Sequence, residues 1–134
     1  MSESLAARYD VQTVRWDDAH RWSPAPRFRR KIILRLLSRL RFTSLMEVGC
    51  AQPYLLVEIA RRFPGRHLAG ADIAASVIED NARRFPAIDF RRLDLQREDL
   101  GRAYDVVICS EVLEHLPDHR AALRNLRPSG LGPL

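Results

Sequence analysis

Short apolar runs alternate with longer amphipathic stretches along the chain from residue 44 onward. The runs have the length and composition of strands, and they predict strands at 44–48, 67–71, 88–93 and 104–109. The stretches between them carry apolar residues at helical spacing and end at Pro64-Gly65 and Pro86, which predicts helices over 54–63 and 75–85. Strands that alternate with helices are typical of an α/β domain with a parallel sheet.

The chain before the first strand divides at residue 27. Residues 1–27 form a polar, partly aromatic N-terminal segment that ends at the breaker Ser23-Pro24-Ala25-Pro26. The apolar residues that follow predict an amphipathic helix over 28–40; they are Phe28, Ile32, Leu36, Leu37 and Leu40. Arginines occupy its other faces, and such a face is more often solvated than bound to phosphate. Residues 28–134 are interpreted as one domain.

The last predicted strand, 104–109, contains the continuous apolar run Val106-Val107-Ile108 and is predicted to be buried on both faces. After it, Pro117 interrupts a helical segment, and Asp118 is placed to cap a short helix that runs to Leu126. Residues 127–134 contain several breakers and predict no further strand.

The first strand runs through Gly49 into a tight turn and a helix, an arrangement that binds ligands at the carboxyl ends of parallel strands. We expect Gly49 to let a ligand approach the backbone or to need a positive φ, although a plain turn is the alternative. Glu47 precedes this turn. A pyrophosphate would gain little from a nearby carboxylate, because such loops hold it with backbone N–H groups. Glu47 therefore favours a cationic ligand such as S-adenosylmethionine over a dinucleotide.

Two aspartates follow the next two predicted strands. Asp72 comes after Gly49 at close to the spacing of about 20 residues at which a second strand delivers an acid to a ribose hydroxyl. Its carboxylate can accept hydrogen bonds from both ribose hydroxyls, and a helix cap is a compatible alternative. Asp94 is placed to accept a hydrogen bond from an adenine amine, with a solvated aspartate as the alternative.

Four segments resemble, in order and spacing, the motifs of class I S-adenosylmethionine-dependent methyltransferases. The segment Glu47-Val48-Gly49-Cys50-Ala51 resembles the glycine-rich loop, and Ala69-Gly70-Ala71-Asp72-Ile73 resembles the segment whose acid takes the ribose hydroxyls. The segment Leu93-Asp94-Leu95 is similar to the one that reads adenine, and 104–116 is similar to the fourth-strand segment of small-molecule methyltransferases. The resemblance covers about residues 28–130, the N-terminal two thirds of such a domain.

The resemblance implies a Rossmann-like parallel sheet of order 3-2-1-4, with helices on both faces and without the last strands of the usual domain. It also implies S-adenosylmethionine as the cofactor and a small molecule as the methyl acceptor. The residues that it places at the cofactor are Glu47, Gly49, Cys50, Ala51, Asp72, Ile73, Asp94, Leu95 and Ser110. His115 is the candidate general base, although a structural role is the more common alternative. Pro117 breaks the helix that would align His115 with His119 as a metal pair.

The glycine-rich loop departs from the family pattern at two positions. Ala51 and Pro53 stand where the family has glycines. Alanine is a small change, whereas proline removes one backbone N–H donor near the expected ligand. Pro53 also suits the start of a helix, where that N–H has no helical partner.

The amino-acid composition indicates which partners and which cellular location to expect. The formal net charge is +5, but Lys31 is the only lysine among 22 basic residues. Such arginine usage is typical of a GC-rich genome, and we do not expect a nucleic-acid partner. Cys50 and Cys109 are expected to be buried, reduced thiols. The sequence has no run long enough to span a membrane and no signal-peptide pattern, which indicates a cytoplasmic protein.

Two functions stay open at this point. The first is a methyltransferase, and the second is a truncated, non-catalytic cofactor-binding module that needs a partner chain. In the order 3-2-1-4 the strand 104–109 becomes a sheet edge, so we expect self-association or a partner chain there. A nicotinamide dinucleotide enzyme is disfavoured because the pattern Gly-x-Gly-x-x-Gly is absent.

Overall fold

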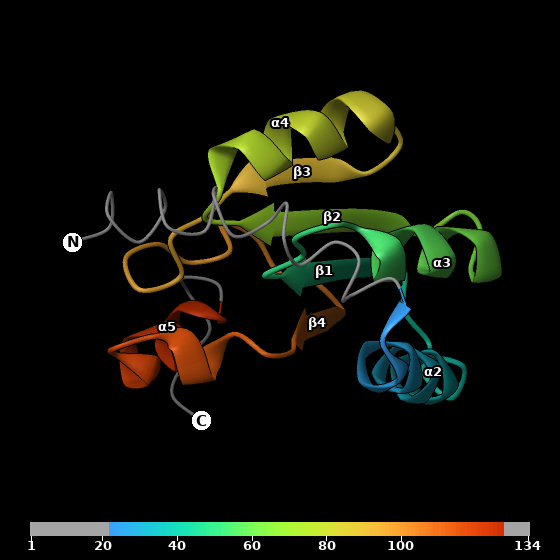
Figure 1. Cartoon of the computed structure of the whole chain (residues 1–134), viewed down its shortest axis with the longest axis horizontal. Helices are drawn as coiled ribbons and strands as arrows, with labels where there is room; N and C mark the ends of the chain where they lie inside the picture. Colours follow the sequence, from blue (N-terminus) through green and yellow to red (C-terminus); the bar gives the residue numbers. More distant parts are fainter. Residues whose placement is uncertain (1–21, 128–134) are drawn as a thin grey trace.

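The computed structural model describes residues 22–127, and within them four parallel strands form one sheet of order β3-β2-β1-β4 (Figure 1). The strands are β1 (Ser44–Val48), β2 (His67–Asp72), β3 (Asp89–Arg92) and β4 (Val106–Cys109). The predicted strand order is therefore confirmed. Val48 pairs with Ala71 on one side and with Cys109 on the other, so the carboxyl ends of β1, β2 and β4 lie side by side.

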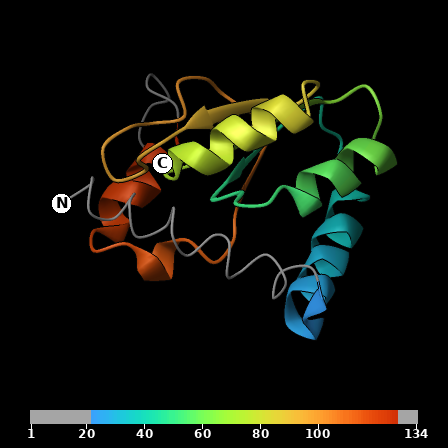
Figure 2. The same ribbon diagram turned by 45° about the horizontal axis from the view of Figure 1, so that its top comes forward.

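Helices cover both faces of the sheet, as predicted. On one face lie α2 (Pro24–Leu37), α3 (Tyr54–Arg62) and α4 (Ala75–Arg84), which Figure 2 shows along the same side. On the other face lie the loop after β3, the 3₁₀ turn η1 (Leu113–His115) and α5 (His119–Asn125). The predicted cap of α5 is confirmed, since the Asp118 Oδ1 accepts a hydrogen bond of 2.9 Å from the Ala121 N–H.

Alternating side chains of the strands feed two separate cores. Leu45 and Ile108 pack among the residues of α2, α3 and α4. Met46 and Val107 pack on the opposite face, against Ala122 of α5 and the apolar residues around it. Because side chains alternate along a strand, Glu47 projects toward the same face as Leu45. The carboxylate is thus directed toward α2 and α3.

The first helix differs from its prediction in two respects. It begins at Pro24 and ends at Leu37, because proline at the first helical position lacks only an N–H that would have no partner there. Its apolar stripe is also not its buried face. Leu37 is the one stripe residue that is buried, together with Leu34 outside the stripe, whereas the other stripe residues are 44–65% exposed; these are Phe28, Ile32, Leu36 and Leu40.

The last strand is also shorter and more exposed than predicted. It spans Val106–Cys109, and only Ile108 is buried while its neighbours are half-buried. The physical reason is its edge position, because within the described residues β4 pairs with β1 alone. Asp105 fixes its start: its Oδ2 accepts hydrogen bonds from the Thr43 N–H, at 2.7 Å, and from the Thr43 hydroxyl, at 2.8 Å. These bonds lower the pKa of Asp105.

Residues 1–21 of the predicted N-terminal segment and residues 128–134 after α5 lie outside the described range. Between residues 22 and 127, no helix is both long enough and apolar enough to cross a membrane.

Candidate cofactor site at the ends of the strands

The turn after β1 is built on two residues with left-handed backbone. Gly49 has a φ of 74° and Ala51 a φ of 41°, so the predicted positive φ of Gly49 is confirmed. The Gly49 and Cys50 N–H groups both donate to the Ala71 carbonyl, at 2.7 and 3.0 Å. A Cβ on Gly49 would lie 2.3 Å from the Val112 Cγ2. Position 49 therefore requires glycine for two reasons. Its φ is positive, and the Val112 side chain, which follows β4, leaves no room for a Cβ.

Glu47 is a buried carboxylate with no ion-pair partner among residues 22–127. Its Oε2 is shielded from solvent and has no hydrogen-bond partner among the described residues. Burial raises the pKa of Glu47 to about 8, and the negative charge of Asp72 adds to this effect, while Arg30 opposes it. A carboxylate of this kind would be stabilised in its ionised form by a cation placed beside it.

Asp72 holds the same turn from the end of β2. Its Oδ2 accepts a hydrogen bond from the Ala51 N–H, and its Oδ1 accepts one from the Ala74 N–H, both at 3.0 Å. The second bond lies at the start of α4, in line with the cap that the sequence allowed as an alternative. An ionised carboxylate has about four acceptor positions, so one such group can accept several hydrogen bonds at once.

Asn81 is a residue at this turn that the motifs did not identify. It lies on α4, is 0% exposed, and its Nδ2 donates to the Ala51 carbonyl at 2.8 Å. Ala51 is thus held at its N–H by Asp72 and at its carbonyl by Asn81. One signal in the sequence marks Asn81: it falls at helical spacing from Val77 and Ile78, on the buried face of α4.

The residues of the predicted adenine segment already make hydrogen bonds and packing contacts within the protein. Asp94 is 8% exposed, so it is not a solvated aspartate. Its Oδ1 accepts a hydrogen bond from the Gln96 N–H at 3.1 Å, and its Oδ2 lies 3.7 Å from the Arg97 Nε. Leu95 packs in the core, and its carbonyl accepts from Asn125. Ile73 follows β2 directly, and its carbonyl accepts from Arg92.

The residues after β4 are placed less uniformly. Ser110 is half-buried and lies at the end of the edge strand. Glu111 has a φ of 60° and forms an ion pair with Arg29 of α2 at 3.2 Å. His115 ends η1 as an exposed side chain, and no hydrogen bond of its ring is found among the described residues. Its role as a general base stays a prediction.

Of three further residues near the site, Cys50 and Pro53 are buried and Cys109 is half-buried. Cys50 is 4% exposed, and burial raises the pKa of its thiol well above the ordinary value. Cys109 is only half-buried, which differs from the prediction because it lies on the edge strand. Pro53 is buried at the position immediately before α3, where its carbonyl accepts from the Val57 N–H at 2.9 Å.

Comparison with known families gives a match over most of this site. A family model described as a methyltransferase domain matches residues 46–131, which include the second half of β1, the turn at Gly49 and the ends of β2 and β4.

Two curated relatives are similar over most of the chain. The trans-aconitate 2-methyltransferase of Deinococcus radiodurans is 25% identical over 120 residues, which cover 86% of this chain and 46% of the relative. The malonyl-[acyl-carrier protein] O-methyltransferase of Bacillus anthracis is 27% identical over 131 residues, covering 91% of this chain and 46% of the relative. The chain therefore spans about half the length of the curated relatives that it matches.

A solved structure shares the fold. A plantazolicin methyltransferase, in complex with a pentazolic desmethyl analogue and SAH, aligns with a TM-score of 0.71 at 19% identity. The alignment covers 93% of this chain and 51% of that chain.

Proposed function

We propose that this chain, which belongs to the methyltransferase domain family, binds S-adenosylmethionine and serves methyl transfer to a small-molecule acceptor. The observation that carries the proposal is Glu47, a buried carboxylate with an unpartnered oxygen behind the turn at Gly49. A ligand with a positive charge at one end and hydroxyls at the other suits Glu47 and Asp72 together. We place this activity in the cytoplasm.

Each predicted site residue has a role in this proposal. Glu47 would face the charged methionine end of the cofactor, and the turn from Gly49 through Cys50 to Ala51 would lie against the ligand. Asp72, followed by Ile73, would accept hydrogen bonds from the ribose hydroxyls, because a carboxylate can accept from both at once. The adenine would lie near Asp94 and Leu95, and Ser110 would border the site at the end of β4.

The protein's contribution to the reaction is mainly one of positioning. S-adenosylmethionine, when bound, supplies an electrophilic methyl group on a sulfonium. The residues around the turn hold the cofactor in one orientation, and alignment of two reactants is a large source of rate. His115 is the proposed base for an acceptor that must lose a proton, and its exposure on η1 leaves it accessible for that role.

The alternative is a cofactor-binding module that a second chain must complete. The edge of β4 and the apolar stripe of α2 favour this alternative. A groove of about 360 Å³ runs between them, with Ile32, Leu36 and Leu40 on one wall and Val106–Cys109 on the other. An unpaired strand beside exposed apolar side chains is a template for pairing with another chain. We propose that a second copy of this chain pairs there.

A thermal-shift experiment tests the proposed function. S-adenosylhomocysteine should raise the melting temperature of the purified chain, whereas NAD should leave it unchanged. Asp72→Ala should lose that stabilisation, because it removes acceptors for the ribose hydroxyls as well as for two backbone N–H groups. Stabilisation by NAD alone would contradict the proposal.

A separate measurement tests pairing through the edge. Analytical ultracentrifugation should find a dimer that Ile32→Glu with Leu36→Glu converts to a monomer, because both side chains line the exposed groove. Lys31→Glu with Arg35→Glu, on exposed positions of the same helix outside the groove, should leave the dimer intact. A wild-type monomer that turns over an acceptor rapidly would contradict the alternative.

A further inference from the structure

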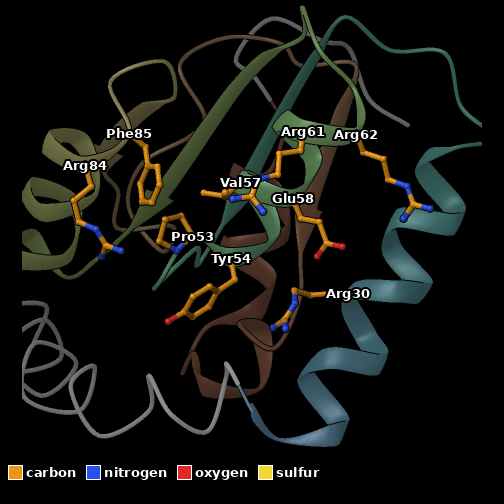
Figure 3. Close-up of a pocket in the computed structure, with 9 residues that line it drawn as sticks. All are labelled: Arg30, Pro53, Tyr54, Val57, Glu58, Arg61, Arg62, Arg84 and Phe85. Carbon is orange, nitrogen blue, oxygen red and sulfur yellow. The ribbon is translucent and has the colours of Figure 1, made fainter.

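A hollow of about 680 Å³ lies on the outer side of α3, between α2 and α4, and arginines dominate its walls (Figure 3). Arg30 enters from α2, Arg61 and Arg62 from α3, and Arg84 from α4. Glu58 is the one carboxylate among the lining residues. Four arginines and a single acid thus line one concave surface.

Two of the lining arginines, Arg61 and Arg62, have no ion pair among residues 22–127. Arg84 forms an ion pair with Asp80 at 3.1 Å. Glu58 has no ion pair within the same described range. A concave surface with several uncompensated charges of one sign concentrates ions of the opposite sign. Guanidinium groups match the planar or branched oxygens of carboxylates and phosphates especially well.

The hollow also adjoins the candidate cofactor site. Pro53 and Tyr54, which line it, follow directly on the glycine-rich turn. Arg30 lies over the Tyr54 ring, 5.8 Å from its centre, and is close enough to Glu47 to act on the charge of that carboxylate. In Figure 3 the Arg30 guanidinium reaches from α2 toward Tyr54. One arginine therefore links the hollow to the carboxylate of the proposed cofactor site.

We infer that this hollow binds the acidic group of the methyl acceptor, so that the acceptor is a small molecule carrying a carboxylate or a phosphate. This inference rests on the proposed function, because it assigns a substrate class to the same site. The four arginines line one hollow of about 680 Å³, a volume in the range of small-molecule sites, which favours a small anion over a nucleic-acid strand.

Calorimetric titrations with citrate and with inorganic phosphate test the inference, and glycerol serves as the neutral probe. The double variant Arg61→Gln with Arg62→Gln should weaken anion binding at least fivefold. Its matched control, Arg35→Gln with Arg39→Gln, removes the same charge from exposed positions outside the hollow and should change the affinity less than twofold. Glu58→Gln should tighten binding, because it removes the opposing charge. Whichever anion binds more tightly identifies the acid that the hollow prefers.

Three results would overturn the inference. They are no measurable binding of either anion, equal weakening in the two double variants, or binding of a single-stranded RNA that exceeds that of both small anions. A parallel titration with S-adenosylhomocysteine separates the two proposals, and its affinity should stay within twofold in both variants. Anion binding without any binding of S-adenosylhomocysteine would instead contradict the proposed function.

Discussion

The turn between β1 and α3 and the outer edge of β4 differ in how completely the described residues pair their backbone groups and cover their apolar side chains. At the turn, Ala51 is hydrogen-bonded at its N–H by Asp72 and at its carbonyl by Asn81. At the edge, β4 pairs on one side only, and the apolar stripe of α2 is exposed. The turn is stabilised by hydrogen bonds within the chain, whereas the β4 edge and the α2 stripe expose backbone groups and apolar side chains that are usually covered by other protein.

This difference bears on two separate functions, the binding of the cofactor and the transfer of its methyl group. Two of the residues proposed to bind the cofactor, Ala51 and Asp72, are already held by hydrogen bonds at the turn and at the start of α4. Binding of S-adenosylhomocysteine is therefore the property expected of this chain alone, and efficient transfer is expected only when the edge is covered.

The largest expected effect is a dependence of stability on the charge of Glu47. Its folded pKa of about 8 exceeds the ordinary value of 4.5, so the folded state holds a proton that the unfolded state has released. The unfolding free energy should therefore fall as pH rises from 4.5 to 8, by at most roughly 5 kcal/mol from this group. Urea unfolding across that range should show the slope, and Glu47→Gln should flatten it.

A matched acid makes this result specific. Glu58→Gln removes an exposed carboxylate from α3 and should leave the slope as it is in the wild type. A flat profile in the wild type, or the same flattening in both variants, would show that Glu47 is not a buried, unpartnered acid.

The next effect concerns Gly49. Gly49→Ala should lower the unfolding free energy by about 2–4 kcal/mol, because it combines left-handed backbone with a Cβ that meets Val112. Gly65 is the control: its φ is 77°, but no atom lies within 4 Å of its added Cβ. Gly65→Ala should therefore cost only about 1–2 kcal/mol. Denaturant unfolding of both variants measures the difference.

The pair of glycines separates two causes. Adding Val112→Ala to Gly49→Ala should recover the steric part and leave the backbone part. Equal losses in the two single variants, with no recovery in the double variant, would mean that the contact with Val112 is unimportant.

The smallest effect is expected at Asn81. Asn81→Leu removes the bond to the Ala51 carbonyl and should lower the unfolding free energy by about 1 kcal/mol. Ala51 would keep its hydrogen bond to Asp72 but lose the one from Asn81. The Kd of S-adenosylhomocysteine should therefore rise about tenfold, equivalent to about 1.4 kcal/mol. Thr43→Val removes the hydroxyl bond to Asp105, at the opposite end of the strands, and should leave that Kd unchanged. An unchanged Kd in Asn81→Leu would make its role purely structural.

Hydrophobic spacing, breaker residues and capping residues predicted the sheet well, because these signals depend only on residues a few positions apart. The bounds of β1, the stop of α3 before Pro64-Gly65 and the cap at Asp118 all follow from residues within a few positions. The positive φ at Gly49 belongs to the same kind of signal, because a strand that turns directly into a helix favours glycine.

The errors arose where a distant partner decides the outcome. The stripe from Phe28 to Leu40 has the spacing of a buried face, but Leu34 and Leu37 are the residues that meet the core. The run Val106-Val107-Ile108 has the composition of a strand buried on both faces, yet at the predicted sheet edge only Ile108 is buried. Asn81 escaped notice because its importance depends on Ala51, which is far away in the sequence.

Isothermal titration of the purified chain with S-adenosylhomocysteine at pH 7 tests the central claim most directly. Run in two buffers with different ionisation enthalpies, it should show binding at one site per chain and the release of protons, because the ligand's ammonium would ionise Glu47. Glu47→Gln should bind more weakly and release none through this group. No binding heat in either buffer, or binding that Glu47→Gln leaves unchanged, would contradict the proposed role of this carboxylate.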